Sequence, residues 1–207
     1  MSSWAIVAVK ARAQSKQRLA TTLDAAGRVE LVRRMLDHVL ATAAACRAID
    51  RVVVVSPERD RVPPDVPVVA DAGIGLNEAL DVARNQARGS GAIEIVVLPA
   101  DLPLLETADL ETLIDAGRSS GVAIATDRTG VGTNGLYLPT SLDFPFRFGT
   151  RSHVAHVAAA RLLDVPYETV RSAGFAFDVD TPKDVRRLQT PRSAVPRWRW
   201  SWSSVEP

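Results

Sequence analysis

The sequence lacks several features that would assign it to particular classes of protein. It has a single cysteine, so no internal disulfide can form and nothing indicates an oxidising compartment. No apolar run reaches the roughly 18 residues that a membrane-spanning helix requires, and an apolar segment begins at Trp4, too early for us to expect a signal peptide before it. The formal net charge of +1 argues against a large nucleic-acid-binding surface. We therefore expect a cytoplasmic protein that binds neither membranes nor nucleic acids.

Common catalytic motifs are also missing or out of place. Neither a P-loop, G-x-x-x-x-G-K-[ST], nor a nucleophile elbow, G-x-S-x-G, occurs. Residues 130–135 fit G-x-G-x-x-G, but that dinucleotide fingerprint must open a helix, whereas 136–138 is predicted to be a strand. His153 and His156 share a predicted helix three residues apart, yet no cysteine or second acidic motif lies near them to complete a metal site. These observations disfavour a Rossmann dehydrogenase, a P-loop NTPase and an elbow-type hydrolase.

What the sequence does contain is an alternation of apolar, β-branched segments with amphipathic ones. Strands are predicted at 4–9, 51–56, 66–70, 93–98, 122–126, 136–138, 167–170 and 175–178. Helices are predicted at 24–47, 76–88, 107–117, 151–163 and from 182 onward, with Asp24 and Thr107 as N-caps of the first and third. This order predicts one α/β domain with a mostly parallel sheet and helices on both faces.

The final segment, 190–207, has a different composition from the rest of the chain. It contains three tryptophans, three arginines and several prolines. We expect the domain to span 1–189 and the remainder to be a tail that is mobile or docks a partner.

Two acidic loops, far apart in sequence, follow predicted strands. Asp101 follows the strand at 93–98, and Asp178 and Asp180 lie at the end of the strand at 175–178. Any of these acids alone could simply cap a turn or helix. However, the carboxyl ends of parallel strands meet at the edge where open α/β sheets bind ligands, and two carboxylates can hold one Mg²⁺ against nucleotide phosphates. We therefore expect Asp101 and Asp180 to share a magnesium ion, with Asp178 as a further candidate ligand.

A basic segment follows the first predicted strand. Lys10, Arg12, Lys16 and Arg18 fall within nine residues that contain no acid. Such a segment can be a solvated loop, but its position after a strand favours a cradle for a triphosphate. The glycine turn that ends just before Leu76 allows close approach to a nucleotide base, to which Asn77 could offer its amide, although Asn77 could instead cap its own helix.

Short segments in this order resemble motifs of the phospholactate guanylyltransferases, enzymes of coenzyme F(420) biosynthesis. The segments are 8–10 with 15–19, 76–80, 98–103, 147–149 with Ser152, and 178–182. The resemblance implies a single domain with the nucleotide-diphospho-sugar transferase type of nucleotidyltransferase fold. It also implies transfer of GMP from GTP to a phosphorylated three-carbon acid, with release of pyrophosphate. The acceptors in this family are 2-phospho-L-lactate, phosphoenolpyruvate or 3-phospho-D-glycerate.

The resemblance also implies roles for individual residues. Mg²⁺ would bind Asp101 and Asp180, and the acceptor would lie near Thr133, Gly149 and Ser152. Together with the basic segment, this suggests that GTP contacts a set made of Val9, Lys10, Lys16, Arg18, Asn77 and Asp101. The catalytic residues would be Asp101, Asp180 and Lys16. No general base is needed, because a phosphate monoester is largely a dianion at neutral pH.

Other interpretations stay open at this stage. The Asp-Leu-Pro and Asp-Thr-Pro elements are shared by many nucleotidyltransferases, so a molybdopterin or sugar-phosphate nucleotidyltransferase is an alternative. A non-catalytic nucleotide-binding scaffold is another. The sequence also leaves open whether the protein forms a homo-oligomer or binds a downstream transferase.

Overall fold

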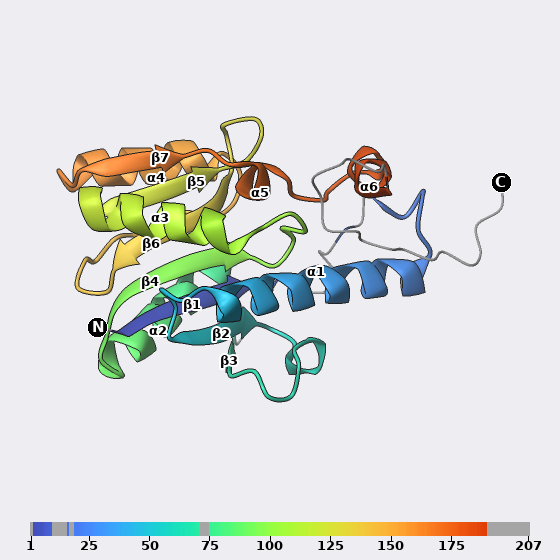
Figure 1. Ribbon diagram of the computed structural model, residues 1–207, viewed down its shortest axis with the longest axis horizontal. Helices are drawn as coiled ribbons and strands as arrows, with labels where there is room; N and C mark the ends of the chain where they lie inside the picture. The colour runs from blue at the N-terminus through green and yellow to red at the C-terminus, as the bar shows by residue number, and fades with distance from the viewer. Residues whose placement is uncertain (1, 10–15, 17–18, 71–74, 190–207) are drawn as a thin grey trace.

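A computed structural model describes residues 2–9, 16, 19–70 and 75–189, and its centre is a seven-stranded mixed sheet (Figure 1). The strand order is β3-β2-β1-β4-β6-β5-β7. β6 is antiparallel to β4 and β5, and the other neighbouring pairs are parallel. The strands are β1 Ser2–Ala8, β2 Arg51–Ser56, β3 Val68–Ala70, β4 Ala92–Pro99, β5 Val122–Thr126, β6 Thr133–Pro139 and β7 Tyr167–Val170. The predicted α/β fold with a mostly parallel sheet is confirmed.

Helices cover both faces of this sheet, because successive strand residues point to opposite sides. Leu36 of α1 and Leu113 of α3 pack with Val7 on one face. Leu80 of α2 and Ala160 of α4 belong to the core on the other face. The helices are α1 Ala25–Ala45, α2 Leu76–Gly89, α3 Thr107–Ser120, α4 Ser152–Leu162, α5 Ala173–Ala176 and α6 Pro182–Gln189, with a short 3₁₀ helix, η3, at Arg59–Arg61.

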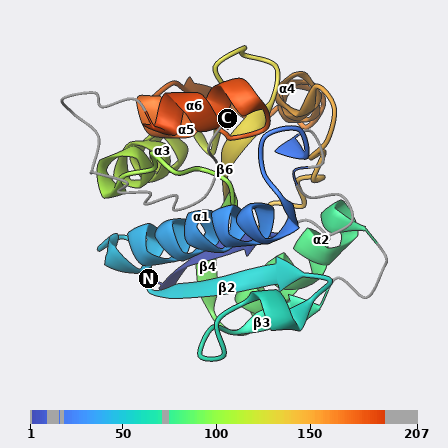
Figure 2. The same cartoon turned by 90° about the vertical axis from the view of Figure 1, so that its right-hand side faces the viewer.

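A third, smaller core lies beyond the ends of the strands. Leu19, Leu31, Met35, Val179 and Val185 form its buried centre together with Leu23. It joins the first half of α1 to α6, and both helices extend past the sheet in Figure 1, with α6 above α1 in Figure 2. This core brings the segment that follows β1 next to the segment that precedes α6, although the two are far apart in sequence.

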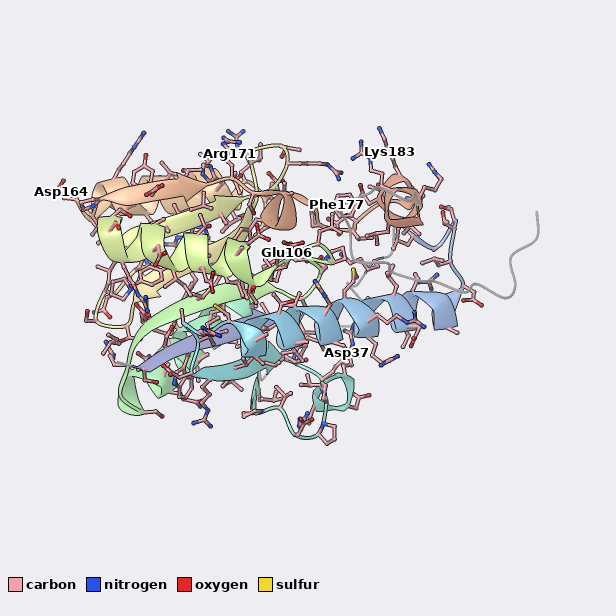
Figure 3. The ribbon with its side chains drawn as sticks, in the orientation of Figure 1. Asp37, Glu106, Asp164, Arg171, Phe177 and Lys183 are labelled. Carbon is pink, nitrogen blue, oxygen red and sulfur yellow. The ribbon has the colours of Figure 1, made fainter. Side chains whose placement is uncertain are left out.

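The prediction of a strand at 175–178 is wrong. The chain instead forms the short helix α5, where the Ser172 hydroxyl accepts a hydrogen bond of 3.3 Å from the Phe175 N–H. Phe175 is fully buried, and a Cβ at Gly135 of β6 would come within 2.7 Å of its ring. The apolar spacing of this segment fits a strand or a helical turn equally well, so burial of Phe175 decided the outcome. Asp178 and Asp180 therefore follow a helix and an irregular link, in which Figure 3 labels Phe177.

Other element boundaries agree with the sequence prediction to within a few residues. Asp24 caps α1, as predicted, by accepting a hydrogen bond of 2.7 Å from the Gly27 N–H. The N-cap of α3 is Glu106 and not Thr107, because Glu106 and Asp109 form a reciprocal capping box. Residues 130–135 lead into β6 and not into a helix, as expected.

Part of the sequence prediction concerns residues outside those that the structure describes. The predictions for Lys10, Arg12, Arg18, most of the glycine turn before Leu76 and the tail at 190–207 belong to that part. Among the described helices, none combines the length and the apolar character that a membrane span requires.

Candidate active site

The two acidic loops converge on Lys16. Its ammonium nitrogen, Nζ, donates hydrogen bonds to Oδ2 of Asp101 and, at 2.8 Å, to Oδ1 of Asp180. The two carboxylates therefore lie within two hydrogen-bond lengths of each other. The Lys16 side chain is only 6 % exposed and that of Asp101 only 16 %, so this pair interacts with little screening by solvent, whereas the Asp180 side chain is 46 % exposed. The predicted convergence of Asp101 and Asp180 is present in the structure.

The fold explains how these three residues meet. Asp101 follows β4, which ends beside β1, where the Ala100 N–H donates a hydrogen bond of 3.1 Å to the Ala8 carbonyl. Lys16 has a φ of 55°, an uncommon conformation for a residue other than glycine. Its carbonyl accepts a hydrogen bond of 3.0 Å from Leu19, which anchors it to the third core. Val179, the residue before Asp180, is buried in the same core.

Asp184 holds the backbone at Asp180 in place. Its Oδ2 accepts hydrogen bonds from the N–H groups of Asp180, at 3.3 Å, and Thr181, at 2.9 Å. Its Oδ1 accepts a hydrogen bond of 2.7 Å from Arg128. Burial by itself would raise the pKa of Asp184, but the bonds from Arg128 and Thr181 lower it overall. The sequence analysis assigned no site role to Asp184 or Arg128, although an acid three residues after a Ser or Thr is the capping-box signal that could have indicated Asp184.

Asp178 belongs to the same electrostatic cluster. Burial, and then the charges of Asp101 and Asp180, raise its pKa to about 6. Among the described residues, however, no group of three or more His, Cys, Asp or Glu side chains is placed to hold one metal ion. A metal at this site would therefore rely on the pair Asp101 and Asp180 and on oxygen atoms from its substrate. That donor set fits Mg²⁺, which is usually held by one or two carboxylates together with phosphates and water.

A cavity of about 60 Å³ lies beside this cluster. Its lining includes Val9, Lys16, Asp101 and Asp180, so four residues predicted to bind nucleotide or metal share one space. Arg61 of η3 also lines it, with a side chain that is only 11 % exposed. Arg61 was not predicted as a site residue, because an arginine in a short segment between two strands carries no recognisable motif.

A second cluster joins the residues predicted to bind the acceptor. The Thr133 N–H donates a hydrogen bond of 2.8 Å to Oγ of Ser152, which brings the start of β6 next to the start of α4. Oγ1 of Thr133 lies 2.9 Å from Nδ1 of His156. Nε2 of the same ring accepts a hydrogen bond of 2.9 Å from the Arg147 N–H. Gly149, two residues after Arg147, has a φ of 136°, a conformation that strongly favours glycine.

The Asn77 amide binds the backbone of Phe148. Its Oδ1 accepts a hydrogen bond of 2.8 Å from the Phe148 N–H, and its Nδ2 donates one of 3.2 Å to the Phe148 carbonyl. The amide therefore holds the segment that leads to Gly149. The Asn77 side chain does not cap α2, because the N-cap of that helix is Gly75. The structure thus links Asn77 to the predicted acceptor residues.

The histidines of α4 do not face a common site. Nε2 of His153 lies 3.2 Å from the Thr169 hydroxyl, whereas His156 bonds to Thr133 and Arg147. Only His156 is therefore part of the second cluster.

Solved structures with the same architecture define the class of protein. A Desulfovibrio desulfuricans protein described as a nucleotide-diphospho-sugar transferase aligns with a TM-score of 0.74 and 19% identity, over 91% of this chain and 87% of that one. A 4-diphosphocytidyl-2C-methyl-D-erythritol synthase aligns with a TM-score of 0.63 and 19% identity, over 91% of this chain and 97% of that one. The fold is that of the nucleotidyltransferases.

The sequence comparisons identify the family within this class. The chain belongs to the family described as guanylyl transferase CofC like, whose family model matches residues 3–190. A phosphoenolpyruvate guanylyltransferase from Sphaerobacter thermophilus is 36% identical, over 91% of this chain and 93% of that protein. One from Rubrobacter xylanophilus is 37% identical, over 91% and 94% respectively. The protein is therefore a nucleotidyltransferase of a guanylyltransferase family, as the sequence motifs predicted.

Proposed function

We propose that this enzyme transfers GMP from GTP to a phosphorylated three-carbon acid and releases pyrophosphate, as a step of coenzyme F(420) biosynthesis. The observation that carries the proposal is the convergence of Asp101 and Asp180 on one buried cation, Lys16. Two relatives that are 36% and 37% identical are named phosphoenolpyruvate guanylyltransferases, which makes phosphoenolpyruvate our first choice of acceptor. 2-Phospho-L-lactate and 3-phospho-D-glycerate are the other two candidates.

In this proposal Asp101 and Asp180 hold one Mg²⁺, and Asp178 adds negative charge close to it. When bound, the ion would supply positive charge to the α-phosphate and to the departing pyrophosphate. Lys16 bonds to the same carboxylates, so a metal bound between them would take its place there, and the displaced ammonium would move to the phosphates as a second positive charge. The cluster would thereby offset the repulsion between an anionic acceptor and an anionic nucleotide.

The phosphates of GTP would lie at the cavity beside this cluster. Val9 and Lys16 line the cavity, and Arg61 adds a further cation to its lining. Guanidinium and ammonium groups bind phosphate oxygens through charge-assisted hydrogen bonds. Lys10 and Arg18 lie outside the described residues, and their predicted contacts with the triphosphate remain part of the proposal.

The acceptor would bind at Thr133, Gly149 and Ser152. An oxygen of its phosphate would form a bond to the α-phosphorus of GTP, while the bond from that phosphorus to the bridging oxygen breaks. The electron pair of the broken bond leaves with pyrophosphate. Because the attacking phosphate is already largely deprotonated, the protein needs no general base. Its task would be to position the two substrates and to stabilise charge.

A mass-spectrometric competition assay tests this proposal directly. The enzyme is incubated with GTP, Mg²⁺ and equal concentrations of the three acids, and a downstream acceptor traps unstable guanylylated products. We expect pyrophosphate and one guanylylated acid, with CTP, ATP and UTP inactive. Turnover of CTP with a molybdopterin or a sugar phosphate would instead identify a molybdopterin or a sugar-phosphate nucleotidyltransferase. Nucleotide binding without release of pyrophosphate would instead indicate a scaffold.

A further inference from the structure

His156 is the least exposed titratable group of the acceptor cluster. Its exposed fraction is 0 %, and the rings of Phe148 and Phe144 lie 5.0 and 6.0 Å from it, centroid to centroid. Both ring nitrogens have hydrogen-bond partners, so the imidazole orientation is fixed at two points. In the sequence, His156 was predicted only as a possible metal ligand together with His153.

We propose that His156 is a positioning residue, whose proton on Nδ1 forces the Thr133 hydroxyl to act as a hydrogen-bond donor to the anionic acceptor, beside the Ser152 hydroxyl that the Thr133 N–H orients in the same way. The inference rests on the proposed function, because it concerns the site that would hold the phosphorylated acid. His156 itself would not touch the reacting atoms.

The tautomer of His156 follows from its partners. The Arg147 N–H is a backbone donor, so Nε2 must accept and carries no proton. A neutral ring then has its proton on Nδ1 and donates it to Oγ1 of Thr133. Burial, followed by the charges of His153 and Arg147, lowers the pKa of His156 to about 4, which agrees with a neutral ring at pH 7.

This tautomer and the Thr133 N–H together determine what the two hydroxyls can do. Oγ1 of Thr133 accepts from His156, and Oγ of Ser152 accepts from the Thr133 N–H. Each hydroxyl therefore keeps its own proton for another partner. Within the part of the chain that the structure describes, neither proton has an acceptor, although Thr133 is only 6 % exposed and Ser152 only 3 %. Leaving buried donors unsatisfied is costly, so the arrangement favours an acceptor from outside the chain.

The surroundings of the two hydroxyls favour an anionic ligand. Ser152 is the first residue of α4, where the helix dipole is positive. The Arg147 backbone is held by His156, and that of Phe148 by Asn77, so the segment leading to Gly149 is fixed from two sides. A carboxylate or phosphate oxygen, which can only accept hydrogen bonds, matches the two donors. His156 thus sets the polarity of the site through a residue that the ligand would contact.

Two substitutions at His156 separate the roles of its two nitrogens. In His156→Asn, the amide nitrogen lies near the position of Nδ1 and can still donate to Thr133. In His156→Gln, the longer side chain can accept from Arg147 but loses the donor to Thr133. We expect KM for phosphoenolpyruvate to stay within about threefold in His156→Asn and to rise about tenfold or more in His156→Gln, with KM for GTP unchanged in both. His153→Asn serves as the control on the same helix.

Equal acceptor KM values in the two His156 variants, or a change confined to GTP, would overturn the inference. ¹⁵N NMR of the His156 imidazole in the wild-type protein provides a test that requires no variant. A ring protonated on Nδ1 at pH 7 is expected, and one protonated on Nε2 contradicts the proposal. If the wild-type enzyme guanylylates none of the three acids, the proposed function fails, while the NMR result still decides the state of His156.

Discussion

Lys16 donates a hydrogen bond of 2.8 Å to Asp180, which lies 164 positions later in the chain. The same ammonium bonds to Asp101 and so lies between two carboxylates that would otherwise repel each other. Burial alone would lower the pKa of Lys16, but the charges of Asp101 and then Asp180 raise it overall, so the side chain is charged at neutral pH. Lys16 is therefore an internal cation at the position where the proposal puts a metal ion.

The first prediction concerns Lys16 itself. Lys16→Ala should raise KM for GTP about tenfold or more, because the triphosphate would lose a buried cation. The variant should also show a larger increase in Tm on addition of Mg²⁺ than the wild type, since the metal would replace the missing positive charge.

Lys183→Ala is a suitable control, because Lys183 is exposed on the outer side of α6 (Figure 3). Steady-state kinetics and thermal shift with Mg²⁺ measure the two effects. If KM for GTP is the same in wild type and Lys16→Ala, Lys16 only holds the two aspartates together.

The second prediction concerns the proposed metal ligands. Asp101→Asn and Asp180→Asn should each reduce turnover by about two orders of magnitude or more, the range seen when a group that stabilises transition-state charge is removed. Asp143→Asn, at a side chain that is 83 % exposed, should behave as wild type. The rate of pyrophosphate release is the measurement, and near-normal rates in both site variants would remove the metal assignment.

The third prediction concerns the support of Asp180. Arg128→Gln leaves the buried carboxylate of Asp184 without its ion-pair partner, which should cost about 1–3 kcal/mol of unfolding free energy. Turnover should also fall, because the turn that carries Asp180 loosens. Arg187→Gln, on the exposed side of the neighbouring helix α6, is the control. Denaturant unfolding and kinetics test both effects, and unchanged turnover would mean that Asp184 stabilises α6 without positioning Asp180.

The fourth prediction concerns Arg61. Arg61→Gln should raise KM for GTP and leave KM for the acceptor unchanged, because Arg61 lines the cavity beside Lys16 and not the Thr133 cluster. Arg47→Gln, at an exposed position after α1, provides a control for the loss of one positive charge. An increase in the acceptor KM alone would show that the acceptor, and not GTP, binds at the cavity that Arg61 lines.

The fifth prediction concerns stability at low pH. The pKa of His156 falls from its ordinary value of 6.5 to about 4 in the folded protein. Between these values the unfolded chain binds more protons at this residue than the folded chain, so stability falls as the pH drops from 6.5 towards 4. The loss from this residue is at most about 3 kcal/mol.

Carboxylates with lowered pKa values, such as Asp184, contribute a loss in the same direction at lower pH. Comparing urea unfolding of the wild type and His156→Gln at several pH values isolates the contribution of His156. The unfolding free energy should fall more steeply with decreasing pH in the wild type than in the variant. The difference in slope should correspond to at most one bound proton. Parallel curves would show that His156 titrates normally in the folded protein.

Some parts of the fold and the site could be predicted from local patterns. Apolar β-branched runs predicted the strands, and the order of strands and helices predicted the mostly parallel sheet. Asp101 could be placed at a strand end, because the apolar run 95–98 precedes it. For Asp180 the prediction of proximity was right, but its local reason was wrong, since no strand precedes it.

Other features depend on contacts that have no local pattern. The Asn77 amide is compatible with a base contact, a helix cap or a backbone clamp, and only the tertiary structure shows that it binds the Phe148 backbone and does not cap α2. His156 and Arg61 are ordinary residues in the sequence, and their environments come from segments that are distant along the chain.

By itself, the sequence determined the class of sheet, the acidic and basic residue types of the site and the family likeness, because these depend on short-range periodicity and ordered motifs. The tertiary structure alone decided which charges meet, which of them are buried and which way the hydrogen bonds run. These properties arise when the third core joins the start of α1 to α6 and when the start of β6 bonds to the start of α4. Electrostatic energies depend on distance and burial, and neither is encoded at a single position in the chain.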